Sequence, residues 1–298
     1  MLNVQNIVSP TKYNYINPIC DHFFQKKMAF SALDRIPYNT HLPEVHRFTQ
    51  KYFLKRTLIR GKYNALASGY NKNTRTKVAI KSIYKPQPGQ FKEASILKKL
   101  LSVPGVIKYL DHYTIKCDIQ FLVMEYFGHM SLQFFLSTNG AVSEKIAHVI
   151  FEQLFNTVHE CFKKNILHRK LKPSNILINI KTNQVKIANF NSASKFDSDE
   201  FTSQLSNEIA PPEYFQSKTY TADGLYVWSL GLILYELLFN IKPFNSPIDV
   251  TNTPLVIVPH EQTLSLDVIN FLVWMLAKSN RITINQIAHH PWITKLWV

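Results

Sequence analysis

Residues 168–175 read His-Arg-Lys-Leu-Lys-Pro-Ser-Asn, and the fold is deduced outward from this stretch. A long segment of helical periodicity, from Glu144 to Phe162, precedes it. A short hairpin is predicted after it, with strands at 176–180 and 185–188 around the turn Thr182-Asn183. The eight residues therefore lie between a predicted helix and a predicted hairpin.

The segments on either side of this region differ in type. Strand-like segments fall at 52–59, 62–70, 76–84, 106–113 and 119–126, with one helix-like segment at 91–101. Later helices are predicted at 227–239, 266–276 and 283–288. A β-rich part followed by a mainly helical part predicts an α+β fold. Residues 1–48 mix proline, asparagine and aromatic residues without a period, which predicts an extension that packs loosely or not at all.

Composition narrows the class of protein. The chain has 298 residues, 46% of them hydrophobic and 18% charged, which is typical of a globular protein with a sizeable core. The net charge of +14 comes from basic residues scattered in pairs, with no run of five or more. This scatter favours a solvated basic surface over a nucleic-acid interface. Three widely spaced cysteines, Cys20, Cys117 and Cys161, exclude a disulfide scaffold and show no metal-ligand spacing.

No membrane or export segment is recognised. The longest apolar stretch, from Val227 to Phe239, contains Ser229 and Glu236 and is too short to span a bilayer. The N-terminus lacks the basic and apolar regions of a secretory signal. We therefore expect a cytoplasmic or nuclear protein without a membrane partner, whose oligomeric state the sequence leaves open.

Taken in order, the motifs from about residue 49 to residue 293 resemble the eukaryotic protein kinase domain. The motifs that carry this resemblance are Val78-Ala79-Ile80-Lys81, Phe121-Leu122-Val123-Met124-Glu125-Tyr126, the stretch 168–175, Asn189-Phe190-Asn191, Ala210-Pro211-Pro212-Glu213 and Val227-Trp228-Ser229-Leu230-Gly231. They look most similar to the calcium/calmodulin-type Ser/Thr kinases, and in particular to the PIM group. The resemblance implies a two-lobed fold. The small lobe covers about 49–124 and the large lobe about 128–293, with an N-terminal extension at 1–48 and a tail at 294–298.

The resemblance also implies a set of site residues. The candidate ATP site comprises Lys81, Glu93, Gly61, Ala79, Glu125, Lys172, Asn175 and Leu177. His168 is expected to pack with Phe190 and Leu97, and Glu213 is expected to form a buried ion pair with Arg281. The retained polar residues of the ATP site either contact nucleotide or serve only the fold, and the sequence leaves both readings open.

Two departures from the family pattern affect catalysis directly. Lys170 stands where the family has its catalytic aspartate, and an ammonium group has no acceptor with which to take a proton. Asn189 stands at the metal-binding aspartate and brings no negative charge for Mg²⁺, which favours carboxylates. In the segment 59–64 only Gly61 remains of the glycine-rich phosphate loop. We therefore expect no intact catalytic residue, no metal site, weak ATP binding at most and no use of Mg²⁺.

Other positions bear on substrates. Asp197, Asp199 and Glu200 are candidates for a relocated base, although a solvated acidic patch is the preferred interpretation. The resemblance places Ser131, Phe134 and Ser174 where PIM-like kinases carry substrate-binding carboxylates, so we expect a neutral or basic groove. Tyr226 replaces the aspartate with which the central helix usually braces the catalytic loop.

The combined prediction is a pseudokinase, a catalytically inactive Ser/Thr kinase-like module that acts as a scaffold or regulator by binding protein partners. A nucleic-acid partner is disfavoured. The alternative is a weak or atypical ATP-dependent Ser/Thr protein kinase.

Overall fold

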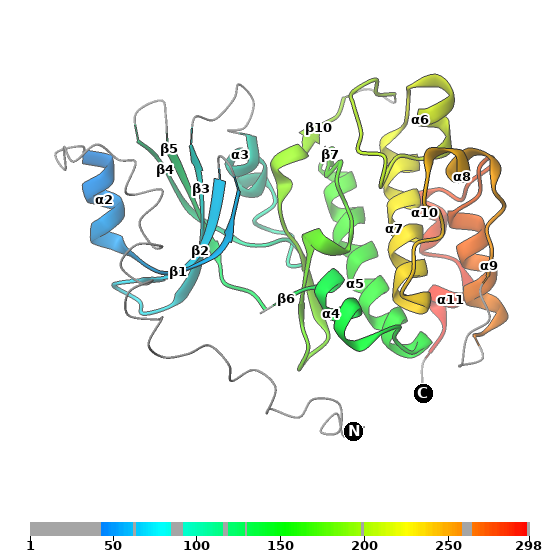
Figure 1. Ribbon diagram of the computed structural model, residues 1–298, viewed down its shortest axis with the longest axis horizontal. Coiled ribbons are helices and arrows are strands. Elements are labelled where there is room, and N and C mark those ends of the chain that lie inside the picture. The colour runs from blue at the N-terminus through cyan, green and yellow to red at the C-terminus, as the bar shows by residue number, and fades with distance from the viewer. Residues whose placement is uncertain are drawn as a thin grey trace. The chain divides into compact units, whose positions relative to one another are not determined.

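The computed structural model describes residues 43–61, 64–84, 92–115, 119–128, 130–197, 200–257 and 264–296 (Figure 1). These residues group into two compact units. The first contains the described residues up to 84 together with 110–126, and the second contains 92–109 together with 127–296. The α+β class is confirmed, with a β-sheet in the first unit and mainly helices in the second.

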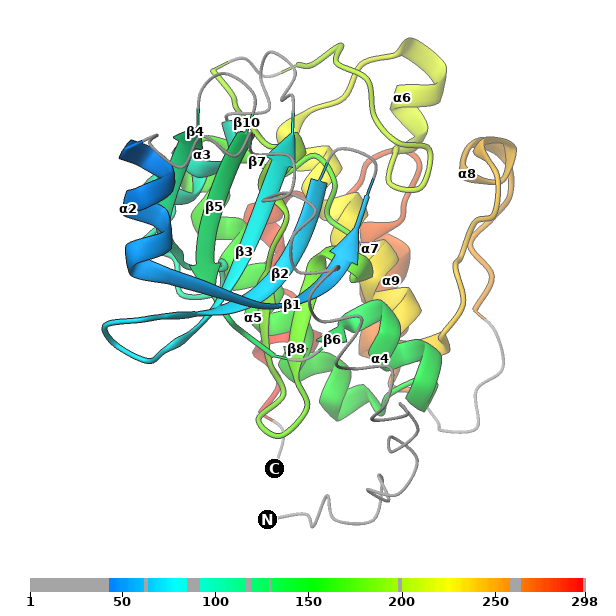
Figure 2. The ribbon, with the colours of Figure 1, turned by 60° about the vertical axis from the view of Figure 1, so that its left-hand side comes forward.

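A five-stranded antiparallel sheet, in the order β1-β2-β3-β5-β4, forms the first unit (Figure 2). Its strands are β1 (Tyr52–Arg60), β2 (Asn64–Asn71), β3 (Lys77–Tyr84), β4 (Tyr109–Ile115) and β5 (Ile119–Glu125). Successive side chains of a strand point to opposite faces, so Val78 and Ile80 share one face of β3 while Ala79 and Lys81 share the other. Val78 and Ile80 are buried in the core of this unit.

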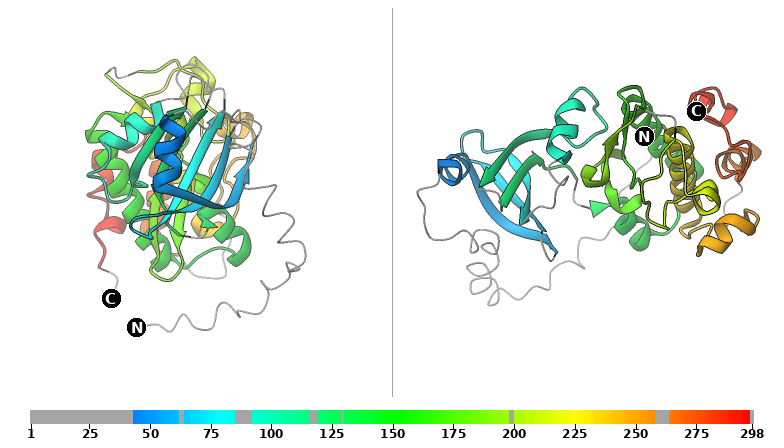
Figure 3. Two further views of the ribbon diagram at one scale, coloured as in Figure 1. Left: turned by 90° about the vertical axis from the view of Figure 1, so that its left-hand side faces the viewer. Right: turned by 90° about the horizontal axis from the view of Figure 1, so that it is seen from above.

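Helix α2 (Pro43–Lys51) covers the Val78 face of the sheet (Figure 3). Its Phe48 ring stacks on Phe121 at 4.4 Å between centroids and meets Tyr113 edge-on. Phe48 is 1% exposed, so it belongs to the core of the unit. The predicted loose extension is therefore wrong for residues 43–48, because two apolar residues of this helix have partners on the sheet. Residues 1–42 lie outside the described residues.

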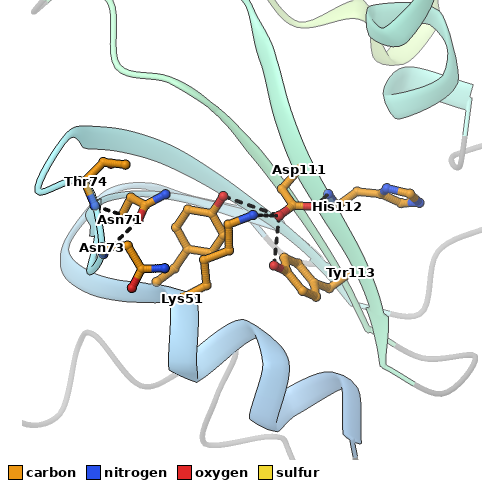
Figure 4. Close-up of polar contacts among 8 residues, drawn as sticks. Lys51, Asn71, Asn73, Thr74, Asp111, His112 and Tyr113 are labelled. Carbon is orange, nitrogen blue, oxygen red and sulfur yellow. Dashed lines mark hydrogen bonds and ion pairs between the residues drawn. The ribbon is translucent and has the colours of Figure 1, made fainter.

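A polar cluster fixes the end of α2 to strand β4 (Figure 4). The Lys51 ammonium lies 2.8 Å from Asp111 Oδ2, and the Tyr113 hydroxyl donates to the same oxygen at 2.9 Å. Burial opposes ionisation of Asp111, but the hydrogen bonds from Lys51 and Tyr113 outweigh it, so the pKa of Asp111 is lowered. At the β2–β3 turn, the Asn71 side chain accepts hydrogen bonds from two backbone N–H groups, which closes the hairpin.

The second unit is built around two long helices, α5 (Glu144–Lys163) and α7 (Ala222–Phe239), which pack against each other. Its other helices are α3 (Lys92–Lys99), α4 (Leu132–Asn139), α6 (Pro212–Ser217), α8 (Pro247–Asn252), α9 (Leu266–Met275), α10 (Ile284–Ile287) and α11 (Pro291–Thr294), with short helical turns η3 (Pro173–Asn175) and η4 (Phe190–Ser192). Its short strands are β6 (Met130–Ser131), β7 (Ile166–Leu167), β8 (Ile176–Asn179), β9 (Gln184–Ile187) and β10 (Ser194–Lys195).

Helix α7 is the core helix of this unit. It is apolar on all sides, and 72% of its 18 residues are buried. Among the described residues it is the one helix long and apolar enough to span a membrane, but its burial inside the unit is what a core helix shows. It begins at Ala222 rather than at the predicted 227, because the Thr221 side chain caps it by accepting a hydrogen bond from the Gly224 N–H.

Candidate active site

Strand β3 carries the site residues of the first unit. Lys81 lies opposite Leu66 of β2 and Leu122 of β5, and Ala79 lies opposite Met124. Residues directly opposite each other in a sheet share a face, so Leu66, Ala79 and Lys81 form one surface. Glu125 is the last residue of β5. It follows Val123 by two positions, so it lies on the same face of the sheet as Val123, which is the core face.

The Asn64 side chain takes up space next to Gly61 at the turn between β1 and β2. The Gly61 N–H donates to the Asn64 carbonyl at 2.8 Å. The side-chain oxygen of Asn64 lies 2.5 Å from the point that a Cβ at Gly61 would occupy. The amide of Asn64 therefore fills space beside the one glycine retained in this loop.

In the second unit, the 168–175 loop is held by buried polar contacts. The Tyr226 hydroxyl of α7 donates to the Ile166 carbonyl at 2.8 Å and accepts from the His168 N–H at 3.0 Å. The His168 ring accepts from the Lys170 N–H at Nδ1 and donates from Nε2 to the Ala188 carbonyl. Burial lowers the pKa of His168 to about 4, so the ring is neutral at pH 7.

Two side chains and a backbone carbonyl meet where the loop approaches residue 189. The Asn175 amide nitrogen donates to the Lys170 carbonyl at 2.8 Å, and the Asn189 amide nitrogen donates to the Asn175 side-chain oxygen at 2.9 Å. Asn189 has a left-handed backbone, with φ at 63°, a conformation that asparagine tolerates better than most residues.

The direction of these two amides follows from chemistry alone. A backbone carbonyl can only accept, so the Asn175 NH₂ group must face Lys170 and its oxygen must face Asn189. Asn189 must then present its own NH₂ group, because two oxygens at 2.9 Å would repel. The Asn189 NH₂ group therefore lies next to the Asn175 oxygen. A metal ion bound at this point would need an oxygen acceptor in place of that donor.

A carboxylate that the sequence alone did not reveal neutralises the loop lysine. Lys172 forms a short ion pair with Glu208, which also lies 3.7 Å from the Lys242 ammonium. The hydrogen bond from Lys172 holds the pKa of Glu208 below its ordinary value. Nearby on α7, burial raises the pKa of Glu236 to about 7, an effect that the charge of Lys242 partly offsets. Glu208 and Glu236 thus place acidic groups near Lys172 at positions other than 131, 134 and 174.

Comparison with known proteins identifies the family. Residues 52–293 match the protein kinase domain. The chain belongs to this family. It is 28% identical over 260 residues to the serine/threonine-protein kinase prk-2 of Caenorhabditis elegans, covering 83% of this chain and 59% of that protein. It is 31% identical over 255 residues to the kinase SIK2 of Gallus gallus, covering 81% of this chain and 32% of that protein.

A third kinase relative matches almost end to end. The serine/threonine-protein kinase pim-2 of Danio rerio is 28% identical over 290 residues, covering 90% of this chain and 93% of that protein. The chain spans only 59% and 32% of the other two kinases, so their whole-protein activities do not transfer to it directly.

The remaining kinase motif residues are placed as follows. Glu93 is buried on α3 and groups with the second unit, whereas Lys81 belongs to the first. Leu177 lies half-buried on β8. Asp197 and Glu200 are exposed, and Asp199 lies outside the described residues. Among the described side chains, no group of three or more His, Cys, Asp or Glu residues could hold a metal ion.

Two of the predicted contacts are confirmed, that of His168 with Phe190 and that of Glu213 with Arg281, although Glu213 is half-buried rather than buried. His168 is 1% exposed and meets the Phe190 ring edge-on at 4.6 Å between centroids. Glu213 and Arg281 form a two-pronged ion pair, with both nitrogen–oxygen distances at 3.0 Å. The bracing role of Tyr226 was not predicted, since a tyrosine at that position carries no signal until its hydroxyl is seen between two backbone groups.

Proposed function

We propose that this chain is a pseudokinase, a protein kinase domain of the PIM-like group that binds a protein partner instead of transferring phosphate. The observation that carries the proposal is the hydrogen bond from the Asn189 amide nitrogen to the Asn175 side-chain oxygen. It joins two positions that should both offer oxygen atoms to a metal ion. Lys170, which supplies no base, lies in the same network through its carbonyl.

Magnesium does not fit this donor set. Mg²⁺ favours carboxylates and keeps near-ideal octahedral geometry, whereas this network offers two neutral amides joined by a hydrogen bond and no carboxylate. Lys172, the loop lysine nearest to Asn175 in the sequence, is neutralised by Glu208. Any ATP binding should therefore be weak, indifferent to Mg²⁺ and dependent mainly on Lys81 and the apolar residues of the sheet.

The direct test is phosphotransfer by the purified full chain. With radiolabelled ATP and a mixed panel of peptides and proteins, label transfer should not exceed that of the Lys81→Ala variant. General base catalysis alone contributes about 10²–10⁴-fold, and the missing metal charge removes further stabilisation of the same transition state. Robust transfer that Lys81→Ala abolishes would overturn the proposal. Thermal shift with ATP, in the presence and absence of Mg²⁺, tests the nucleotide separately.

One observation favours the alternative, a weak Ser/Thr kinase. Glu208 is an ionised carboxylate in contact with Lys172 of the loop, and such a group could accept a proton from a substrate hydroxyl. Under this alternative, Glu208→Gln would abolish a measurable residual rate, and Asp197→Asn would not. If neither variant changes a rate that equals the Lys81→Ala background, the alternative is rejected.

The remaining functional expectations are part of the same proposal. A protein partner is expected because the domain retains a packed, capped core while Lys170 and Asn189 replace the aspartates of the family pattern. A cytoplasmic or nuclear location is proposed, without a membrane or nucleic-acid partner. The oligomeric state is left open.

A further inference from the structure

A cavity of about 550 Å³ lies at one end of the sheet of the first unit, where β1 begins and β2 leads into the turn to β3. Its described lining consists of two aromatic residues, an amide and two cations, namely Phe53, Tyr70, Asn71, Lys72 and Arg75. No carboxylate belongs to this described lining. A space bounded by rings and by positive charge is suited to a ligand that is both apolar and anionic.

The two rings of the cavity belong to one face of the sheet. Phe53 lies directly opposite Tyr70 in the register of β1 and β2, and residues paired in this way share a face. The neighbouring Leu54 packs against the core that α2 covers, so Phe53 lies on the other face. Phe53 is 56% exposed, although removing a phenylalanine side chain from water is favourable. Its ring is therefore accessible to an apolar side chain of a partner.

The two cations of the cavity have no counter-charge among the described residues. No described carboxylate forms an ion pair with Lys72 or Arg75. The Lys72 ammonium donates to the Thr49 carbonyl in the last turn of α2, which uses one of its three donors. The described part of the first unit carries nine lysine and arginine residues, whereas its carboxylates are Glu44, Asp111 and Glu125. An acidic ligand would therefore meet a positive field around the cavity.

The turn that carries both cations has a fixed shape (Figure 4). The Asn71 side chain accepts from the N–H groups of Asn73 and Thr74 at 2.9 and 3.2 Å, and the Asn71 carbonyl accepts from the Arg75 N–H at 2.9 Å. Arg75 has a left-handed backbone, with φ at 59°, a conformation in which glycine or asparagine is less strained. The turn itself does not need a cationic side chain at this strained position, which points to a role outside the turn.

A glycine next to Tyr70 brings the two strands of the cavity close together. A Cβ at Gly69 would overlap the Phe53 carbonyl oxygen and would lie 2.9 Å from Cδ1 of Ile80. A larger residue would push β1 away from β2, so the position of Phe53 beside Tyr70 depends on this glycine. Rings and cations that the framework already holds in place lose little further freedom when a ligand binds.

We propose that this cavity binds an acidic segment of a partner protein, in which a bulky apolar side chain lies against Phe53 and Tyr70 and carboxylates on either side of it bind Lys72 and Arg75. The inference rests on the proposed function and specifies the chemistry of the partner. Arginine binds a carboxylate through two parallel hydrogen bonds, and the remaining donors of a lysine ammonium attract one as a point charge.

An extended peptide fits this surface better than a nucleic acid or a small ligand. The Lys55 ammonium lies over the Tyr70 ring, 5.5 Å from its centroid, so a face on which a base would stack is already covered. Arg56 lies opposite Ser68 in the register, two positions before Tyr70. It therefore shares a face of the sheet with Phe53. Positive charge thus continues along β1 beyond the cavity, which suits a chain longer than a small molecule.

Fluorescence anisotropy with the full chain, in the absence of ATP, tests the proposal. The probe is a short labelled peptide with one central phenylalanine flanked by glutamates. It contains no serine, threonine or tyrosine, so it cannot serve as a kinase substrate. Three ligands are compared with it, namely the peptide with alanine in place of phenylalanine, the peptide with glutamine in place of glutamate, and a single-stranded oligonucleotide of equal charge.

The test variant is Phe53→Thr/Arg75→Asn. Threonine is favoured in strands and asparagine tolerates the left-handed backbone at 75, so this variant should keep the fold. The matched control is Leu58→Thr/Arg47→Gln, which removes one exposed apolar side chain and one positive charge from the same unit outside the cavity. Circular dichroism melts show that each variant is folded.

The acidic peptide with phenylalanine should bind the wild-type chain, and the cavity variant should lose about tenfold or more in affinity while the control variant loses little. Equal losses in the two variants would mean that only the net charge attracts the peptide, which overturns the site. Equal affinity for the peptide without phenylalanine overturns it too, because the rings would then play no part. Absence of binding at low ionic strength has the same consequence.

The oligonucleotide decides between the two classes of partner. If it binds more tightly than the peptide and the cavity variant abolishes this binding, a nucleic acid replaces the protein partner and the proposal is overturned. Phosphotransfer is measured apart from these titrations. An active kinase would therefore overturn the proposed function, while the peptide titrations alone decide whether the cavity is a binding site.

Discussion

Removal of the Arg281 side chain should destabilise the second unit strongly, whereas truncation to alanine at the loop positions 170 and 189 should have a much smaller effect. The Arg281 guanidinium bonds both oxygens of Glu213, donates to the carbonyls of Ala277 and Gly224 at 3.0 and 3.1 Å, and lies 4.9 Å from the Trp228 ring. Its side chain is 9% exposed, and that of Glu213 is 33% exposed. Arg281→Ala would leave a mostly buried carboxylate and two carbonyls without this donor.

The magnitude follows from that exposure. Breaking a fully buried ion pair by removing one partner typically costs about 3–5 kcal/mol. Water reaches a third of the Glu213 side chain, so the lower end, about 3 kcal/mol, is expected. For a domain of this size, about 1 kcal/mol shifts the melting temperature by about 2–4 °C, which predicts a drop of about 6–12 °C. Lys170→Ala and Asn189→Ala should each shift the melting temperature far less, because both side chains are partly exposed.

Urea denaturation and calorimetry of the three variants measure this difference. A double variant, Arg281→Ala with Glu213→Gln, provides the internal control. It removes the uncompensated charge together with its partner and should regain part of the loss. If the three single variants melt together, the ion pair contributes nothing to stability. If the double variant is no better than Arg281→Ala, the loss comes from packing against Trp228 and not from the charge.

Three further predictions concern the loop region. His168 has its ordinary pKa of about 6.5 in the unfolded chain and a pKa of about 4 in the folded chain. The free energy of unfolding should therefore fall by about 2 kcal/mol between pH 7 and pH 5. In urea titrations, His168→Gln should make this pH dependence flatter. Asn189→Asp should lower the melting temperature without metal, because its carboxylate would face the Asn175 oxygen, and should gain a stabilisation by Mg²⁺ that the wild type lacks; an unchanged response to Mg²⁺ contradicts the assignment of these amides. Lys170→Asp with Asn189→Asp should not yield a normal kinase, since Asn64 still crowds Gly61, and strong phosphotransfer by this double variant would show that the loss is local.

The strands and long helices could be predicted from the sequence because each has a strong local pattern. Runs of β-branched and apolar residues marked β3 and β5, and helical periodicity marked α5. Helix α2 lacked such a signal, since only Val45 and Phe48 are buried on it and the ring that Phe48 stacks on, Phe121, lies far along the chain. A buried face of two residues is too short to stand out against the prolines and asparagines that surround it.

The candidate site could be predicted only as a set of positions. Motif order placed Lys170, Asn175 and Asn189 at the positions of catalytic groups, but motif order cannot show which of them contact each other. The ion pair of Lys172 with Glu208 joins residues 36 positions apart, and no motif links the two. A lysine in a partly buried loop requires a counter-charge, and that requirement was the one available signal.

The contacts that hold the loop differ in kind from the groups that would perform catalysis. Tyr226, the His168 ring and the Asn175 amide position it through neutral hydrogen bonds to backbone atoms. None of these bonds needs a carboxylate, a nucleotide or a metal ion, so the loop conformation does not depend on phosphate chemistry. Lys170 and Asn189 in place of the two aspartates of the family pattern can therefore remove catalysis while leaving the surface of the loop in place. A loop held this way keeps its conformation without catalytic chemistry, as the proposed binding function requires.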